Sequence, residues 1–166
     1  QTHTAVYNAA TRKMTSTSPA GRQSVITLDA KGHITAIEND PAFGLAPRQY
    51  TYDPNGRIML SQQGPQSWTF GYDAKSRLIS RTDAAGSGVA IAYDAADRRS
   101  QMTLPGGRVY TYTHDASGNL SQVTMPGSGV HQLGSSPVNL ESSYTPPGNN
   151  PYVFGRDADS RVSQVT

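Results

Sequence analysis

The feature that most constrains this chain is a seven-residue pattern that returns along it at a nearly fixed interval. The stretch YDPNGRI around Asp53 returns as YDAKSRL around Asp73 and again as YDAADRR around Asp94. Self-similarity at a fixed period, here about 21 residues, indicates a repeat architecture and outranks any local prediction of secondary structure. The chain is therefore expected to build one small structural unit many times.

Further copies extend the pattern in both directions. They are LDAKGHI, HDASGNL and RDADSRV, centred on Asp29, Asp115 and Asp157. The step from Asp29 to Asp53 is slightly longer than the others, because residues 41–47 insert a Pro-rich loop, and the step from Asp115 to Asp157 is twice the usual interval. One copy is therefore expected to be hidden in the long step.

Two degenerate copies complete the array. The stretch GSSPVNL around Ser136 falls where the hidden copy belongs, so residues 131–145 are interpreted as a degenerate repeat. Asn8 lies one repeat before Asp29 and stands where the other copies have aspartate. Residues 1–166 thus form a single array of about eight repeats, and we expect it to be a fragment of a larger protein.

The centre of each copy has the chemistry of a tight turn. Asp53 can accept a hydrogen bond from the backbone two residues on, Pro54 fixes φ at the second position, and Gly56 tolerates a positive φ. A type I turn followed by a left-handed glycine is a common hairpin connection. Each copy is therefore predicted to be a β-hairpin.

The residues before each turn alternate between large and small. Trp68, Phe70 and Tyr72 lie on one side of the predicted strand, with Thr69 and Gly71 on the other. A period of two is typical of strands, so the sheet should have one bulky face and one small-residue face.

The residues after each turn break this alternation. Leu120 and Val123 are three positions apart, as are Val162 and Val165. Strict alternation would put the members of each pair on opposite faces, so we expect a β-bulge or a local twist next to each turn.

These patterns predict an all-β protein made of tandem hairpins, one for each repeat. Eight copies give about sixteen strands of roughly six residues, and an open antiparallel sheet of that size must curl, split or close. A curling or spiralling sheet of equivalent hairpins is the first prediction. A β-propeller-like arrangement, in which two repeats make one blade and the true period is doubled, and a large barrel are the alternatives.

Composition agrees with short strands and excludes several classes. Hydrophobic residues make up 35% of the 166 residues and charged residues 16%, and the chain is long enough for one ordinary domain with a sizeable core. A net charge of +2 gives no reason to expect nucleic acid as a partner. The absence of cysteine excludes disulfides and thiolate metal sites, and no apolar run is long enough for a membrane span.

The copies YTYDPNGRI, FGYDAKSRL and YTYTHDASGNL resemble the tyrosine-aspartate (YD) repeats of bacterial rearrangement-hotspot (Rhs) proteins, of the C components of Tc toxin complexes and of teneurins. The resemblance covers nearly the whole chain. It implies a hairpin sheet that spirals into a hollow shell. In the bacterial members such a shell encloses a C-terminal toxin domain, and in teneurins it displays adhesion surfaces. A secreted or cell-surface bacterial polymorphic toxin is the implied context.

Several positions depart from the repeat pattern. Tyrosine is replaced at Leu28, His114 and Arg156, aspartate at Asn8, and glycine at Ser76, Asp97 and Ser160.

The recurring residues are candidate structural sites. They are Asp29, Gly32, Tyr52, Asp53, Gly56, Arg57, Tyr72, Asp73, Arg77, Tyr93, Asp94, Arg98, Asp115, Gly118, Asp157 and Arg161. Asp and Arg four residues apart are interpreted as a ladder of turn hydrogen bonds and ion pairs. The candidate ligand-facing aromatics are Tyr50, Trp68, Phe70, Tyr110 and Tyr112; cross-strand packing is the competing interpretation.

No catalytic or metal motif accompanies the repeats. The four histidines, His3, His33, His114 and His131, do not have metal-ligand spacing, and no known nucleophile or nucleotide motif occurs. We therefore expect no enzyme activity, no cofactor and no metal.

Two functions remain open. One is a shell segment whose partners are the remaining repeats and a toxin domain, and the other is a surface module that binds carbohydrate or protein. The isolated segment is also expected to self-associate through its sheet edges.

Overall fold

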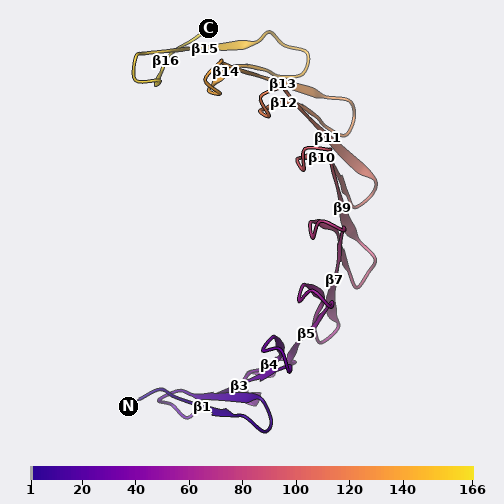
Figure 1. The fold of residues 1–166 in the computed structure, drawn as a ribbon, viewed down its shortest axis with the longest axis vertical. Helices are drawn as coiled ribbons and strands as arrows, with labels where there is room; N and C mark the ends of the chain where they lie inside the picture. The colour runs from indigo at the N-terminus through magenta and orange to yellow at the C-terminus, as the bar shows by residue number, and fades with distance from the viewer. Residues whose placement is uncertain (1) are drawn as a thin grey trace. The chain divides into compact units, whose positions relative to one another are not determined.

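The computed structural model describes residues 2–166 and is all-β apart from one short 3-10 helix, η1 (Pro41–Phe43). The chain divides into two compact units, one ending at Gly88 and the other starting at Val89. Each unit is a succession of antiparallel strands that pair in chain order (Figure 1). The predicted fold class, tandem β-hairpins, is confirmed.

The first unit consists of eight strands, each paired with the next one along the chain. They are β1 (Thr4–Asn8), β2 (Lys13–Thr17), β3 (Gln23–Leu28), β4 (Ile34–Glu38), β5 (Arg48–Tyr52), β6 (Ile58–Gln63), β7 (Gln66–Tyr72) and β8 (Leu78–Asp83). The insertion between β4 and β5 holds η1, which Asp40 caps by accepting a hydrogen bond from the Ala42 N–H.

The second unit repeats this arrangement. Its strands are β9 (Gly88–Tyr93), β10 (Arg99–Leu104), β11 (Arg108–His114), β12 (Leu120–Thr124), β13 (Val130–Ser135), β14 (Glu141–Thr145), β15 (Tyr152–Arg156) and β16 (Val162–Val165). The degenerate stretch near Ser136 forms the hairpin β13–β14, and Asn8 lies at the turn of the hairpin β1–β2.

The pairing within each unit contradicts the propeller alternative. A propeller needs separate sheets of about four strands. Pairing instead runs without interruption from β1 to β8 and from β9 to β16. Within each unit, every strand is hydrogen-bonded to its sequence neighbours, so one hairpin follows another.

The predicted bulge is present beside the turns. In β11–β12, Leu120 pairs with His114 and Val123 with Tyr112, and the register shifts between these pairs. The same shift occurs in every such hairpin from β3–β4 onward. The extra residue brings two apolar positions that are three apart onto one face of the sheet.

The two faces differ as the alternation predicts. Tyr50, Ser61 and Trp68 align across β5, β6 and β7 on what we call the aromatic face. Leu60, Thr69 and other mainly small or polar residues align on the opposite, small-residue face.

The expected sizeable core is absent. No side chain among residues 2–166 is fully buried, because each unit is a single layer in which strands contact only their chain neighbours. The expectation of a core, which was based on chain length, was therefore wrong. A core forms where two layers pack together, and neither unit has a second layer. Stability must come from cross-strand contacts and turns.

Candidate functional site

The Asp53 turn shows what the repeated aspartate does. Its Oδ1 accepts hydrogen bonds from the backbone N–H groups of Asn55 and Arg57, both at 2.9 Å. Its Oδ2 accepts from Arg57 Nε at 2.7 Å and Nη2 at 2.6 Å. The Gly56 N–H closes the turn on the Asp53 carbonyl at 3.0 Å. The carboxylate therefore holds the backbone of its turn with one oxygen and a cation with the other.

Other Asp turns keep the backbone contacts and vary the side chain that binds the second carboxylate oxygen. Arg77 binds Asp73 through Nε at 2.7 Å, and Arg98 binds Asp94 at 2.8 Å. The remaining contacts are His33 Nδ1 to Asp29 at 2.9 Å and Asn119 Nδ2 to Asp115 at 3.1 Å. The arginine four residues after Asp is thus one of three polar side chains that fill this position.

The last copy departs from the ladder predicted from the sequence. Asp157 accepts the backbone N–H groups of Asp159 and Arg161, but the Arg161 guanidinium lies 3.4 Å from Asp159 instead. Both of these side chains are largely exposed. The turn forms here without a clamp, because the backbone hydrogen bonds do not depend on the cation.

The clamped aspartates are held ionised. For Asp53, Asp73 and Asp94, the backbone N–H of the arginine four residues on is the largest cause that lowers the pKa; partial burial opposes it, and the guanidinium adds to the lowering. Each pKa lies below the ordinary value of 3.8.

Two further aspartates reach the same state by other means. The Asn119 side-chain amide is the largest cause of the lowered pKa of Asp115. At Asp29 the largest single effect is burial, which raises the pKa, but the hydrogen bonds from His33 and the neighbouring backbone together lower it. The ladder is thus a row of carboxylates, each stabilised in its charged form.

The fourth turn position has a left-handed backbone whether or not it is glycine. Gly56 has φ 80°, while Ser76, Asp97 and Ser160 have φ of 67°, 65° and 64°. Residues with a Cβ pay a conformational cost there. The departures from glycine therefore leave the turn shape unchanged and place strain in the copies that carry them.

The tyrosines before Asp53 and Asp73 connect their hairpins to the preceding ones. The Tyr72 hydroxyl donates to the Ile58 carbonyl at 3.1 Å, and the Arg57 guanidinium lies 4.6 Å from the centre of the Tyr72 ring. Arg57 Nη1 also donates to the Asp73 carbonyl at 3.4 Å. Asp and Arg of one copy and Tyr of the next thus form one continuous cluster.

The equivalent cluster one copy earlier contains histidine. The Tyr52 hydroxyl donates to the Ile34 carbonyl at 2.7 Å, and its ring stacks on His33 with centroids 4.8 Å apart and an angle of 26°. Burial raises the Tyr52 pKa, with smaller contributions from Tyr50 and Asp29.

In the second unit, a histidine takes the tyrosine position. His114 Nδ1 lies 3.8 Å from Asp94 Oδ2, so this residue also contacts the turn of the preceding hairpin. Tyr93 pairs with Arg99 across the hairpin β9–β10.

The candidate ligand-facing aromatics are half-buried, with Tyr50, Trp68 and Phe70 in the first unit and Tyr110 and Tyr112 in the second. The Arg81 guanidinium sits 3.7 Å from the centre of the Trp68 ring. Arg81 pairs in register with Phe70, and Tyr110 and Tyr112 pair with Met102 and Val123. Cross-strand neighbours thus flank these rings.

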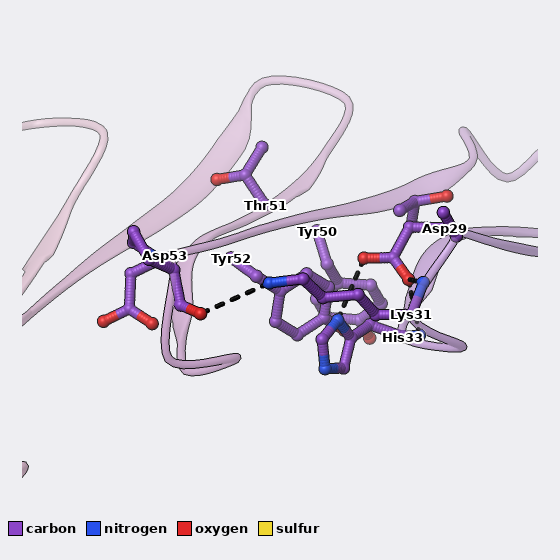
Figure 2. A pocket seen from close by; sticks show the side chains of 10 residues that line it. Asp29, Lys31, His33, Tyr50, Thr51, Tyr52 and Asp53 are labelled. Atoms are coloured by element: carbon purple, nitrogen blue, oxygen red, sulfur yellow. Dashed lines mark hydrogen bonds and ion pairs between the residues drawn. The ribbon is translucent and has the colours of Figure 1, made fainter.

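An open groove of about 530 Å³ lies between the Asp29 and Asp53 turns (Figure 2). Figure 2 shows Tyr50 and Tyr52 behind it and Lys31 reaching across to donate from Nζ to the Pro54 carbonyl at 3.3 Å. His33, on its near side, bonds Asp29. The groove offers two aromatic rings and several polar groups.

Some contacts were not predicted. His131 Nδ1 lies 2.6 Å from the Tyr144 hydroxyl, and Asn119 Nδ2 donates to Asn139 Oδ1 at 2.9 Å. The period did not point to the second contact, because Asn139 matches the left-handed Gly118 of the preceding copy, and Leu140 matches Asn119. The Arg81–Trp68 contact could not be predicted without knowing the strand register that the bulge sets between β7 and β8.

No group of three or more metal-binding side chains converges anywhere in residues 2–166. Nor does this part of the chain contain a helix long and apolar enough to cross a membrane.

The family model of the teneurin YD-shell matches residues 1–166, the whole chain. The chain belongs to the teneurin YD-shell family. No curated protein sequence matches it. The resemblance to YD repeats read from the sequence is therefore confirmed, and with it a shell-type structural family.

Solved structures share this fold at low sequence identity. The crystal structures of TcdB2-TccC3-TEV and of TcdB2-TccC3 each match 96% of this chain with a TM-score of 0.69 and 13% identity. The Tc holotoxin pore of Photorhabdus luminescens, with a substitution in TccC3, matches 89% with a TM-score of 0.51 and 12% identity. The chain spans only 10% to 12% of the length of these proteins.

Proposed function

We propose that this YD-shell segment forms part of the wall of a shell that encloses a C-terminal toxin or effector domain for delivery to other cells. The observation that carries the proposal is the family match over all 166 residues. The mechanism is physical exclusion: hairpins added side by side make a wall one sheet thick, and no chemistry is required of it.

The proposal treats residues 1–166 as one array within a larger exported bacterial protein. Its partners are then the neighbouring YD repeats and the enclosed domain of the same polypeptide. Unbroken strand pairing in each unit supports this, because a repeat that satisfies its neighbours' edges protects them from other chains.

A carbohydrate- or protein-binding surface module is the alternative. Rings used for sugar stacking need an open face. Tyr72, Tyr52 and Trp68 each have one face against Arg57, His33 and Arg81 respectively. This favours a packing role for these rings over ligand binding.

Limited proteolysis of the complete native polypeptide tests the proposal. We expect a C-terminal fragment to resist protease in the folded protein and to be digested after mild denaturation. The matched control is the same C-terminal segment expressed alone, which should be digested at once. Immediate digestion of that segment in the native protein, with the repeats surviving, would overturn enclosure and point to a displayed surface.

A second expectation concerns residues 1–166 in isolation. Strand β1 presents Val6 at 66% and Tyr7 at 53% exposure and carries no charged residue, and β16 presents Val162 and Val165 at 51% and 55%. Uncharged apolar edge strands pair readily with other copies. Sedimentation velocity should show concentration-dependent association, and a monomer at all concentrations would contradict it.

A further inference from the structure

Asn55 and Gly56 form a dipeptide that occurs nowhere else in the sequence. An asparagine followed by glycine loses its side-chain amide most readily, because glycine has no Cβ to shield its backbone nitrogen. The pair occupies the third and fourth positions of the Asp53 turn, and Asn55 is exposed. The third position of the other Asp turns is Lys31, Lys75, Ala96, Ser117 or Asp159. The Asp53 turn therefore carries a reactive amide that the other Asp turns lack.

The reaction joins the Asn55 side chain to the backbone. The Gly56 nitrogen gives up its proton and bonds to Asn55 Cγ, and the side-chain amide group leaves with that proton as ammonia. Water then opens the resulting succinimide ring at one of its two carbonyls. One product is aspartate at position 55. The other is isoaspartate, in which the chain continues through the side-chain carbonyl carbon.

The closed turn opposes this reaction. The Gly56 N–H donates to the Asp53 carbonyl at 3.0 Å, so the attacking nitrogen takes part in the hydrogen bond that closes the turn. The Asn55 N–H donates to Asp53 Oδ1 at 2.9 Å, and the other carboxylate oxygen binds Arg57. Ring formation therefore requires local opening of these hydrogen bonds.

The preceding hairpin, β3–β4, holds this turn from outside. Lys31 Nζ donates to the Pro54 carbonyl at 3.3 Å (Figure 2). The His33 ring lies so close to the turn that a Cβ added at Gly56 would be 3.0 Å from His33 Nε2. His33 also stacks on Tyr52 in β5. Opening of the turn is thus coupled to separation of the two hairpins.

We propose that Asn55 is a deamidation site kept unreactive by the Asp53 turn and by the hairpin β3–β4, so that opening of the joint between β3–β4 and β5–β6 leads to an irreversible covalent change. Isoaspartate lengthens the backbone before Gly56, which removes the geometry of the closing hydrogen bond. Either product places a second carboxylate two residues from Asp53, where like charges repel. Because the sheet has no core and depends on its turns, the modified joint is permanently weakened.

Ageing of the complete native polypeptide near neutral pH and body temperature, followed by peptide mass spectrometry, tests this inference. The readouts are the mass gain at Asn55 and the isoaspartate content of the peptide that contains it. We expect deamidation at least about tenfold slower than in a free peptide of residues 50–60, because the turn must open first. Asn55→Gln controls for the site and should lose the mass gain, since glutamine cyclises far more slowly. Equal rates in the protein and the peptide would overturn the proposal.

Two variants separate the turn from the neighbouring hairpin. Asp53→Ser removes the clamp and should deamidate about three- to tenfold faster in the protein, with little change in the matched peptide. Lys31→Ala combined with His33→Ala removes the contacts from β3–β4, leaves the Asp53 clamp in place and should deamidate about two- to fivefold faster.

Lys13→Ala is the matched control for these variants. It removes an exposed ion pair with Glu38 elsewhere in the same unit and should leave the rate unchanged. A natural rate in Asp53→Ser would overturn protection by the turn. A natural rate in the Lys31 and His33 double variant would overturn the coupling between the hairpins.

Discussion

The hairpins β5–β6 and β13–β14 share a backbone but not the side chains that hold it. In the first, Asp53 N donates to the Arg57 carbonyl at 2.9 Å; in the second, Ser136 N donates to the Leu140 carbonyl at 2.7 Å. Asn139, with φ 60°, takes the left-handed place of Gly56. Both hairpins also keep the bulge after the turn.

Their difference lies in the number of hydrogen bonds to the first side chain of the turn. Asp53 accepts two backbone and two guanidinium hydrogen bonds, whereas Ser136 Oγ accepts one, from Leu140 N at 3.2 Å. The turn shape therefore follows from spacing and the left-handed residue. The carboxylate adds stability and a link to a cation.

Acid should have the largest effect, because it acts on all the clamped aspartates together. Each has a folded-state pKa below its ordinary value of 3.8, so its stabilisation is present above that value and is lost as the pH falls through the lowered pKa. Thermal unfolding between about pH 6 and pH 2 should show Tm falling steeply below about pH 4. A flat Tm over this range would contradict the carboxylate ladder.

Asp53→Ser should have the next largest effect, since it gives the first hairpin the chemistry of the second. A serine retains one backbone acceptor and loses the Arg57 ion pair, so Tm should fall and the Arg57 amide should exchange faster. Asp53→Asn is the matched control. It keeps the backbone acceptor but loses the charge, so its Tm should lie between those of the natural protein and of Asp53→Ser. If Asp53→Ser equals the natural protein in both measurements, the carboxylate is dispensable.

A reciprocal exchange at the left-handed position should give smaller effects of opposite sign. Gly56→Ser introduces a Cβ at φ 80° and 3.0 Å from His33 Nε2, and should cost about 1–2 kcal/mol of unfolding free energy. Ser76→Gly removes the same strain and should stabilise by about 0.5 kcal/mol after the entropy cost of glycine. Urea denaturation measures the change in unfolding free energy for both variants. If both changes have the same sign, the strain argument is refuted.

Tyr72→Phe should have the smallest effect. It removes only the hydroxyl that donates to the Ile58 carbonyl at 3.1 Å and leaves the ring against Arg57. A loss of about 0.5 kcal/mol is expected in urea denaturation. Tyr72→Leu, which also removes the ring, is the comparison and should cost more; if the two variants are equal, the contact with Arg57 contributes nothing.

Much of the fold was predictable because each hairpin is determined locally. The spacing of Asp53 and Gly56 fixed the turn, and the three-residue separation of Leu120 and Val123 fixed the bulge. The missing core was not predictable from one repeat, since a bulky face such as that of Trp68 reads the same whether a second layer covers it or not.

The site was predictable only within a copy. Asp53 and Arg57 are four residues apart and form a pair that the sequence predicts. The contacts of Arg57 with Tyr72 and of Arg81 with Trp68 depend on how neighbouring strands align. The Arg161 guanidinium, which leaves Asp157 for Asp159, shows that a matching residue type does not ensure a matching contact.

The restriction of contacts to adjacent strands within each unit has a consequence for how such proteins change length. A hairpin removed from the middle of such an array would bring together two strands that already have the pairing chemistry of their new neighbours. Duplication of the codons for one repeat would likewise add a hairpin without disturbing a distant contact. Gene segments of this kind can therefore expand and contract in whole repeats, and the size of the folded protein can change in evolution through the number of repeats.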